Sequence, residues 1–142
     1  MPAPGAHRND PDVIRRLLTT PNRWAVVGLS QNRARPAHGI AAYLQGLGKP
    51  IVAVHPRAEP VHGAQAYRTL AEVPGPVHVV DVFVNSARAG AVVDEAIAIG
   101  AGAVWLQQGV VDEEAAARAA AAGLDVVMDT CPAVEVPRLG LG

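Results

Sequence analysis

The sequence predicts an α/β fold in which helices cover both faces of a doubly wound, parallel sheet of five strands. Its apolar segments are short continuous runs, without alternation of polar and apolar residues, which is typical of strands buried on both faces of a parallel sheet. Between these runs, apolar residues recur at helical spacing, so strands and helices alternate along the chain. Such alternation, combined with right-handed crossovers, favours a Rossmann-like arrangement.

The first helix and the first strand have clear boundary signals. Asp10 and Pro11 predict a helix start, because aspartate caps the first turn and proline fits the first helical position. Pro21 ends this helix, and the apolar run 23–28 is the first predicted strand. Residues 29–35 are polar without periodicity and are expected to form a loop. The apolar face of the helix consists of Val13, Ile14, Leu17 and Leu18.

A second helix and a second strand follow. Pro36 opens the helix and Gly48 closes it, and residues 50–54 form the strand. The helix carries an apolar face of Ile40, Tyr43, Leu44 and Leu47. In the connection that comes next, only residues 69–73 are expected to be regular, as a single helical turn.

The second half of the chain repeats the pattern twice more. The remaining predicted strands are residues 77–83, 103–106 and 125–128. Ser86 is expected to cap the helix between the first two, which ends at Gly100. Acidic residues 112–114 open the next helix, since negative charge is favourable at a helix N-terminus, and Gly123 ends it.

The length of 142 residues predicts one domain over residues 1–142. Within it, residues 1–9 are polar and are expected to form a flexible N-terminus. Residues 129–142 contain proline and glycine and are expected to be a C-terminal tail that docks loosely.

Composition and charge exclude several classes of function. The net charge is −1 at pH 7 and no run of Lys or Arg exists, which argues against nucleic acid or an acidic membrane as partner. The N-terminus lacks the apolar segment of a signal peptide and no stretch reaches membrane-spanning length, so we expect a cytoplasmic protein. Cys131 is the single cysteine, and no His/Cys cluster accompanies it, so neither a disulfide framework nor a zinc site is expected.

Polar and small residues gather where the predicted strands end. In open α/β sheets, ligands bind beyond the carboxyl ends of the strands, at the point where the strand order reverses. A glycine at the end of the first strand, Gly28, lets a phosphate approach the backbone, and Arg33 and Arg35 lie beside a helix N-terminus that favours anions. The other candidates at these strand ends are Ser30, Gln31, Asn32, His55, Asn85, Ser86, Gln107, Gln108 and Gly109.

The end of the second strand disfavours a standard NAD site. The GxGxxG fingerprint is absent, and the acidic residue that would hold the ribose hydroxyls is missing, since no acid occurs before Glu59. His55 and Arg57 stand there instead, where they could meet a ribose 3′-phosphate or stack near an adenine. Taken singly, Gly28 could serve only as a turn residue, and His55 only as a cap at the strand end.

No complete catalytic constellation is expected. Ser30 has no evident His and Asp partners for a nucleophilic triad, and Asp94 and Glu95 fall on a helix face where solvation is the simpler interpretation. Cys131 lies near the carboxyl edge of the sheet, but a lone cysteine is more often a small buried residue than a nucleophile.

Several stretches together resemble a known family. They are residues 26–30, 35–38, 43–45, 54–56, 81–83, 93–97, 104–110 and 122–129. In this order they are similar to the small bacterial CoA-binding proteins, which resemble the CoA-binding domain of succinyl-CoA synthetase α-subunits and of ADP-forming acyl-CoA synthetases. The resemblance implies a Rossmann-type fold with coenzyme A across the strand ends. The phosphohistidine domain of the larger synthetases has no counterpart here, so their reaction is not expected.

The resemblance also implies roles for particular residues. It assigns the phosphates to Gly28, Leu29, Ser30 and Arg35, the borders of the adenine and ribose to Val54, His55 and Pro56, and the pantetheine path to Phe83, Val84 and Asn85, with Gln107 and Gly109 opposite. Two positions depart from the family pattern, because Val84 and Thr130 stand where the family commonly has arginine.

Three hypotheses of function follow. The first is a non-catalytic module for coenzyme A or an acyl-CoA, whose protein partner could be a second copy or an acyl-CoA enzyme. The second is an NAD(P)-binding redox enzyme or sensor. The third is a scaffold whose nucleotide cleft is vestigial and filled by its own side chains.

Overall fold

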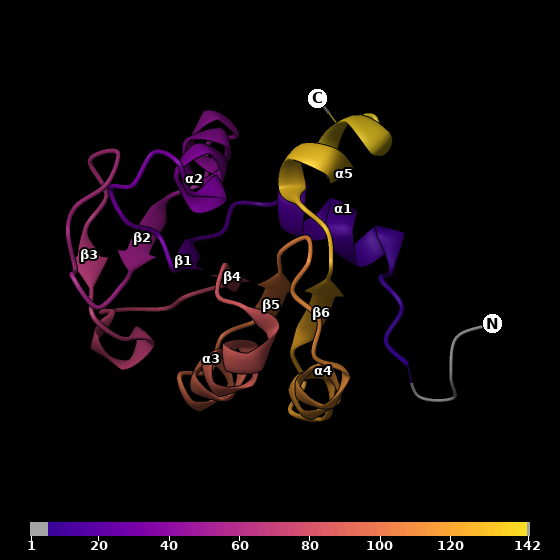
Figure 1. The fold of residues 1–142 in the computed structure, drawn as a ribbon. Helices are drawn as coiled ribbons and strands as arrows, with labels where there is room; N and C mark the ends of the chain where they lie inside the picture. The colour runs from indigo at the N-terminus through magenta and orange to yellow at the C-terminus, as the bar shows by residue number, and fades with distance from the viewer. Residues whose placement is uncertain (1–5, 142) are drawn as a thin grey trace.

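Parallel strands form the centre of the molecule and helices lie on both sides of them (Figure 1). The structure is a computed structural model, and it describes residues 6–141. Its strands are β1 (Trp24–Val27), β2 (Ile51–Val54), β3 (Ala66–Tyr67), β4 (Val79–Val82), β5 (Ala103–Leu106) and β6 (Asp125–Met128). They make one six-stranded sheet in the order β3-β2-β1-β4-β5-β6, with every pairing parallel. The predicted α/β class with a parallel sheet is therefore confirmed.

The helices divide between the two faces of the sheet. They are α1 (Pro11–Thr19), α2 (Pro36–Gly46), α3 (Ser86–Ala98), α4 (Glu113–Ala121) and α5 (Pro132–Arg138), with a 3-10 turn, η1 (Leu70–Glu72). In Figure 1, α1, α2 and α5 lie above the sheet, while α3 and α4 lie below it. None of the helices within residues 6–141 is long and apolar enough to cross a membrane.

Two apolar cores result from this arrangement, one on each face. Successive side chains of a strand point to opposite faces, so Trp24 and Val26 of β1 join the core under α1, α2 and α5. Ala25 and Val27 join the core under α3 and α4. Trp105 is fully buried and packs against Trp24 with ring centroids 5.5 Å apart, so it is a core residue.

The prediction of five strands was wrong by one. The extra strand, β3, has only two residues, which pair with Ala53 and Val54 at the edge of the sheet. So short a segment has no pattern of its own that distinguishes it from a loop. The single turn predicted at residues 69–73 is present as η1, directly after this edge strand.

The C-terminal tail was also predicted wrongly. Residues 129–142 were expected to dock loosely, but α5 packs against α1 and α2, and Val136 is buried. Glu135 is only 4 % exposed, accepts a hydrogen bond of 2.6 Å from the Thr130 hydroxyl, and pairs with Arg138 at 2.7 Å. These polar contacts anchor the helix from within the chain's last segment.

The N-terminal expectation is partly corrected. Residues 1–5 of the segment expected to be flexible lie outside the described residues. Asn9, however, holds the exposed edge of β6, because its side-chain amide donates to the carbonyl of Met128 and accepts from the amide of Met128, both at 2.8 Å. One side chain thus replaces a neighbouring strand at this edge.

We predict that Asn9→Ala lowers the free energy of unfolding by about 1–2 kcal/mol, because it leaves both polar groups of Met128 without their partner. Urea unfolding would measure the change. The control is Arg8→Ala, which removes an exposed side chain next to it and should leave stability unchanged. Equal stability of the two variants would contradict this role for Asn9.

Candidate functional site

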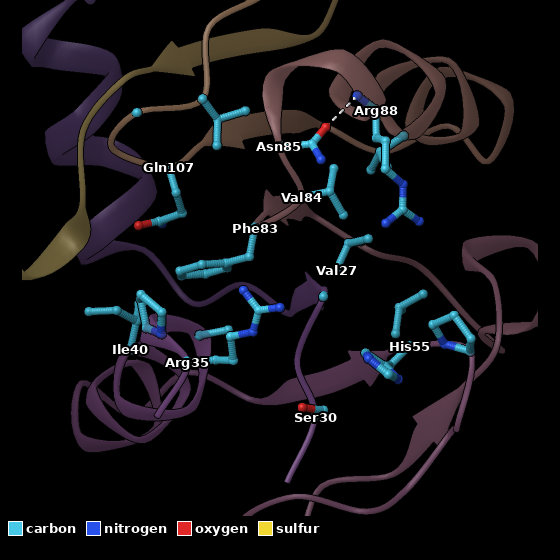
Figure 2. Close-up of a pocket in the computed structure, with 18 of the residues that line it drawn as sticks. Val27, Ser30, Arg35, Ile40, His55, Phe83, Val84, Asn85, Arg88 and Gln107 are labelled. Atoms are coloured by element: carbon cyan, nitrogen blue, oxygen red, sulfur yellow. Dashed lines mark hydrogen bonds between the residues drawn. The ribbon is translucent and has the colours of Figure 1, made fainter. Parts of the chain in front are cut away.

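A cavity lies over the point where the strand order reverses. β1 and β4 are neighbours in the sheet, but the chain continues from β1 toward β2 and from β4 toward β5, in opposite directions. Beyond their carboxyl ends is a cavity of about 870 Å³ that extends from β3 to the start of α5. Figure 2 shows side chains from both helical layers and from the strand ends pointing into it.

Most of the residues proposed from the sequence line this cavity, although they come from four separate loops. They are Gly28, Ser30, Arg35, Val54, His55, Pro56, Phe83, Val84, Asn85, Gln107 and Gly109. Gln108 also lines it, but several proposed residues do not: Leu29, Gln31, Asn32, Arg33 and Ser86. Leu29 is fully buried in the core under α2, and Arg33 lies near His38, whose pKa is lowered by burial, by His62 and by Arg33.

Gly28 forms the floor of the cavity at a point that only glycine fits. Its φ is +101°, a conformation that side chains disfavour. A Cβ placed there would lie 3.2 Å from the Cβ of Phe83 and 3.3 Å from its carbonyl oxygen. The chain therefore turns out of the sheet at Gly28 and presses against the end of β4, which opens the space above.

The loop after β1 leads into α2 with its backbone donors free of side-chain caps. Arg35 is the N-cap residue, and no side chain accepts a hydrogen bond from the first turn, which also contains no acid. Pro36 has no N–H and the His38 amide donates to the Arg35 carbonyl at 3.1 Å, so the positive end of the helix dipole is what favours an anion here. Arg35 lines the cavity beside this helix end (Figure 2), so backbone and side chain offer positive charge to the same region.

At the end of β2, His55 is oriented by its own turn. Its ring Nδ1 accepts from the amide of Arg57 at 3.1 Å, so Nδ1 carries no proton and Nε2 is the donor in the neutral ring. Its backbone amide bonds to the carbonyl of Tyr67 at 3.0 Å, which ties it to β3. Arg57, which the sequence placed next to a ribose, does not line the cavity.

The structure brings in residues that sequence analysis missed. Arg68 and Thr69 follow β3, and their position was hidden because that strand was not recognised. Arg88 lies in the first turn of α3 and points into the cavity in Figure 2. The sequence did contain a signal for Arg88, because it falls in the first turn of a predicted helix that begins directly after a strand end.

The cap of α3 also differs from the prediction. Asn85, not Ser86, is the N-cap, since its side-chain oxygen accepts from the amide of Arg88 at 3.1 Å. The Ser86 hydroxyl instead holds the loop after β5, accepting from the amide of Val111 at 3.0 Å. The Asn85 oxygen is thus engaged by the helix.

A buried carboxyl lies beneath one end of the cavity. Asp81 of β4 is fully buried, and one of its oxygens accepts from the Gln107 amide at 2.6 Å while the other has no partner. Burial raises the pKa of Asp81 to about 8, although the Gln107 hydrogen bond lowers it. At neutral pH the group is therefore mainly a neutral acid.

Cys131 lines the same end of the cavity. Burial is the main cause that raises the pKa of its thiol, and the carboxyls of Asp81 and Glu135 raise it further. A thiol in this environment stays protonated at neutral pH and is a poor nucleophile. Within residues 6–141, no group of three His, Cys, Asp or Glu residues is placed to hold a metal ion.

Comparison with known proteins finds the same family as the sequence resemblance. A family model described as "CoA binding domain" matches residues 22–137. The uncharacterized protein YneT of Bacillus subtilis is 36% identical over 118 residues, covering 83% of this chain and 87% of that protein.

Solved structures share the fold. A hypothetical protein from Pyrococcus horikoshii superposes with a TM-score of 0.87 at 34% identity, covering 94% of each chain. A dinucleotide-forming acetyl-coenzyme A synthetase from Ca. Korarchaeum cryptofilum superposes with a TM-score of 0.73 at 24% identity, over 82% of this chain and 27% of that one. The second likeness concerns the fold alone.

The buried carboxyl gives a prediction about pH. Because the pKa of Asp81 is higher in the folded chain than its ordinary value of 3.8, its contribution to stability is fully present below that value and is lost progressively as the pH rises from there through about 8. We predict that Asp81→Asn, which is neutral at every pH, removes this loss. In urea unfolding series run between about pH 5 and pH 9, the free energy of unfolding of the variant should exceed that of the wild type by about 1 kcal/mol or more at the alkaline end.

The matched control for this prediction is Asp94→Asn, which changes an exposed carboxylate paired with Arg118 at 2.9 Å. It should keep the wild-type fall of stability with pH, since an exposed ion pair contributes little. If the stability of Asp81→Asn falls with rising pH as much as that of the wild type, the buried carboxyl does not cause the loss of stability.

Proposed function

This chain belongs to the CoA-binding domain family, and we propose that it binds coenzyme A or an acyl-CoA in the cavity at the carboxyl ends of its strands. The single observation that carries the proposal is the position and shape of this cavity. It opens at the reversal of strand order, and its volume of about 870 Å³ falls within the range of small-molecule sites.

The chemistry of the lining changes along the cavity as coenzyme A requires. Near α2, Gly28, Ser30 and Arg35 combine a close backbone approach with positive charge, which suits a diphosphate. Toward β2 and β3, Val54, His55 and Pro56 offer an apolar surface with one polar ring, which suits an adenosine.

The opposite end suits the pantetheine arm. Phe83 and Val84 line it with apolar surface, and Gln107 and Gly109 add polar lining, although the Gln107 side-chain amide donates to Asp81 and the Gly109 amide to Asp129. Pantetheine is a thin chain with two amides, so a path that mixes apolar side chains with a few amide partners fits it. Cys131 at the far end would lie near the thiol or the acyl group.

We further propose that the chain binds its ligand without catalysing a reaction. The Ser30 hydroxyl accepts from the amide of Asn32 at 3.2 Å and has no histidine partner within residues 6–141. Cys131 is disfavoured as a nucleophile by its raised pKa. Such a module would present its ligand to a second copy or to an acyl-CoA enzyme.

The two alternatives are less well supported. An NAD site would need an acid near the ribose, but His55 occupies the end of β2, and the GxGxxG turn of both NAD and NADP sites is absent. A vestigial cleft would be filled by its own side chains, whereas this cavity is open.

We predict that coenzyme A raises the melting temperature by several degrees. A ligand that binds only the folded state stabilises it by about 2.7 kcal/mol at a hundredfold excess over its dissociation constant. A thermal-shift titration with CoA, acetyl-CoA, NAD and ATP in parallel would measure this. A shift with NAD but not with CoA would favour the redox hypothesis, and no shift with any ligand would favour the scaffold.

Two neighbouring arginines provide a matched test of the site. Arg35→Gln should weaken CoA binding about tenfold, because it removes a charge from the diphosphate region. Arg33→Gln changes an exposed arginine two residues away that does not line the cavity, and it should bind CoA like the wild type. Equal losses in both variants would indicate a general electrostatic effect and contradict the assigned site.

A further inference from the structure

The cavity contains more positive charge than a diphosphate needs. Three arginines line it from three separate elements: Arg35 at the start of α2, Arg68 after β3, and Arg88 in α3. Glu95 is the one acid among the lining residues. Within the described part of the chain, none of the three arginines forms an ion pair. Like charges held around one cavity repel each other, which favours an anion between them.

The three arginines are not in one place. Figure 2 shows Arg35 on the α2 side of Val27 and Arg88 on its α3 side. The diphosphate region described above, with Gly28 and Ser30, lies with Arg35. The remaining positive charge therefore belongs to a second part of the cavity.

Arg68 and Arg88 come from neighbouring elements on that second side. Arg68 directly follows Tyr67, whose carbonyl accepts from the amide of His55, so it lies at the end of β3 beside the end of β2. α3, which carries Arg88, packs against η1, which begins two residues after Arg68. The two side chains thus approach the region next to His55 from different walls of the cavity.

We propose that Arg68 and Arg88 form the site for the ribose 3′-phosphate of coenzyme A, and that this pair selects coenzyme A over nucleotides that lack a third phosphate. The inference rests on the proposed function. Two guanidinium groups can give a phosphate monoester several charge-assisted hydrogen bonds, and the Nε2 donor of His55 lies on the same side.

This assignment replaces the one suggested by the sequence. The sequence places Arg57 as a candidate for a ribose phosphate because it follows His55 closely. In the structure its side chain is 78% exposed, lies 4.0 Å from Glu59, and does not line the cavity. Arg57 therefore serves as a discriminating variant.

The test compares coenzyme A with 3′-dephospho-coenzyme A by isothermal titration calorimetry at one fixed salt concentration. The wild type should bind coenzyme A at least about tenfold more tightly. Arg68→Gln and Arg88→Gln should each reduce this preference by about tenfold or to unity. They should do so because they weaken the binding of coenzyme A and of no other ligand in the comparison. Binding of the dephospho form should stay unchanged, because the lost contacts involve only the 3′-phosphate. Arg88→Lys should recover part of the preference, since it restores the charge.

Two control variants and a second ligand pair complete the test. Arg57→Gln and Arg15→Gln, an exposed change on α1, should keep the wild-type preference. NADP and NAD differ by a 2′-phosphate, so a larger preference for NADP over NAD than for coenzyme A over its dephospho form would overturn the assignment to a 3′-phosphate.

The outcomes separate the inference from the function it rests on. If the wild type binds coenzyme A but the double variant Arg68→Gln/Arg88→Gln keeps the full preference, the pair is not the 3′-phosphate site. Loss of the preference in Arg57→Gln alone would likewise overturn it. If the wild type binds neither form, the proposed function itself fails. Unchanged melting temperatures of the unliganded variants, expected for exposed arginines, would show that the losses are not losses of fold.

Discussion

The reversal of strand order between β1 and β4 is the constraint on which the rest of the structure depends. From β1 the chain crosses to β2 through α2 on one face, and from β4 it crosses to β5 through α3 on the opposite face. Because the two helices leave neighbouring strands in opposite directions, the space beyond those strands stays unfilled. Gly28 packs closely against Phe83, and because it has no side chain it leaves that space open.

The same geometry distributes charge and apolar surface along the cavity. Helix starts and the segment after β3 supply its arginines, whereas the end toward β5 and α5 supplies amides, an apolar wall and a protonated thiol. A ligand that is anionic at one end and nearly neutral at the other is matched by this gradient. Asp81 fits the neutral end, since a carboxyl that is mainly protonated at neutral pH adds little charge beneath it.

Much of the fold and of the candidate site could be predicted from local patterns. Continuous apolar runs predicted the five longer strands, because burial on both faces requires them. Residues placed at strand ends, such as His55 and Gln107, could be proposed because parallel strands end at one edge of the sheet. β3 and α5 could not be predicted: two residues have no periodicity, and α5 depends on buried partners such as Glu135 and Thr130.

By itself, then, the sequence determined the fold class, the order of elements and the loops that face the ligand, since each follows from local hydrophobic patterning and chain direction. Only the tertiary structure decided which side chains in those loops share a cavity. Arg33 and Arg57 do not line it, whereas Arg68, directly after a short edge strand, and Arg88, in a helix, do. Side-chain direction and the packing of distant elements set this outcome, and neither is encoded in the spacing of residues along the chain.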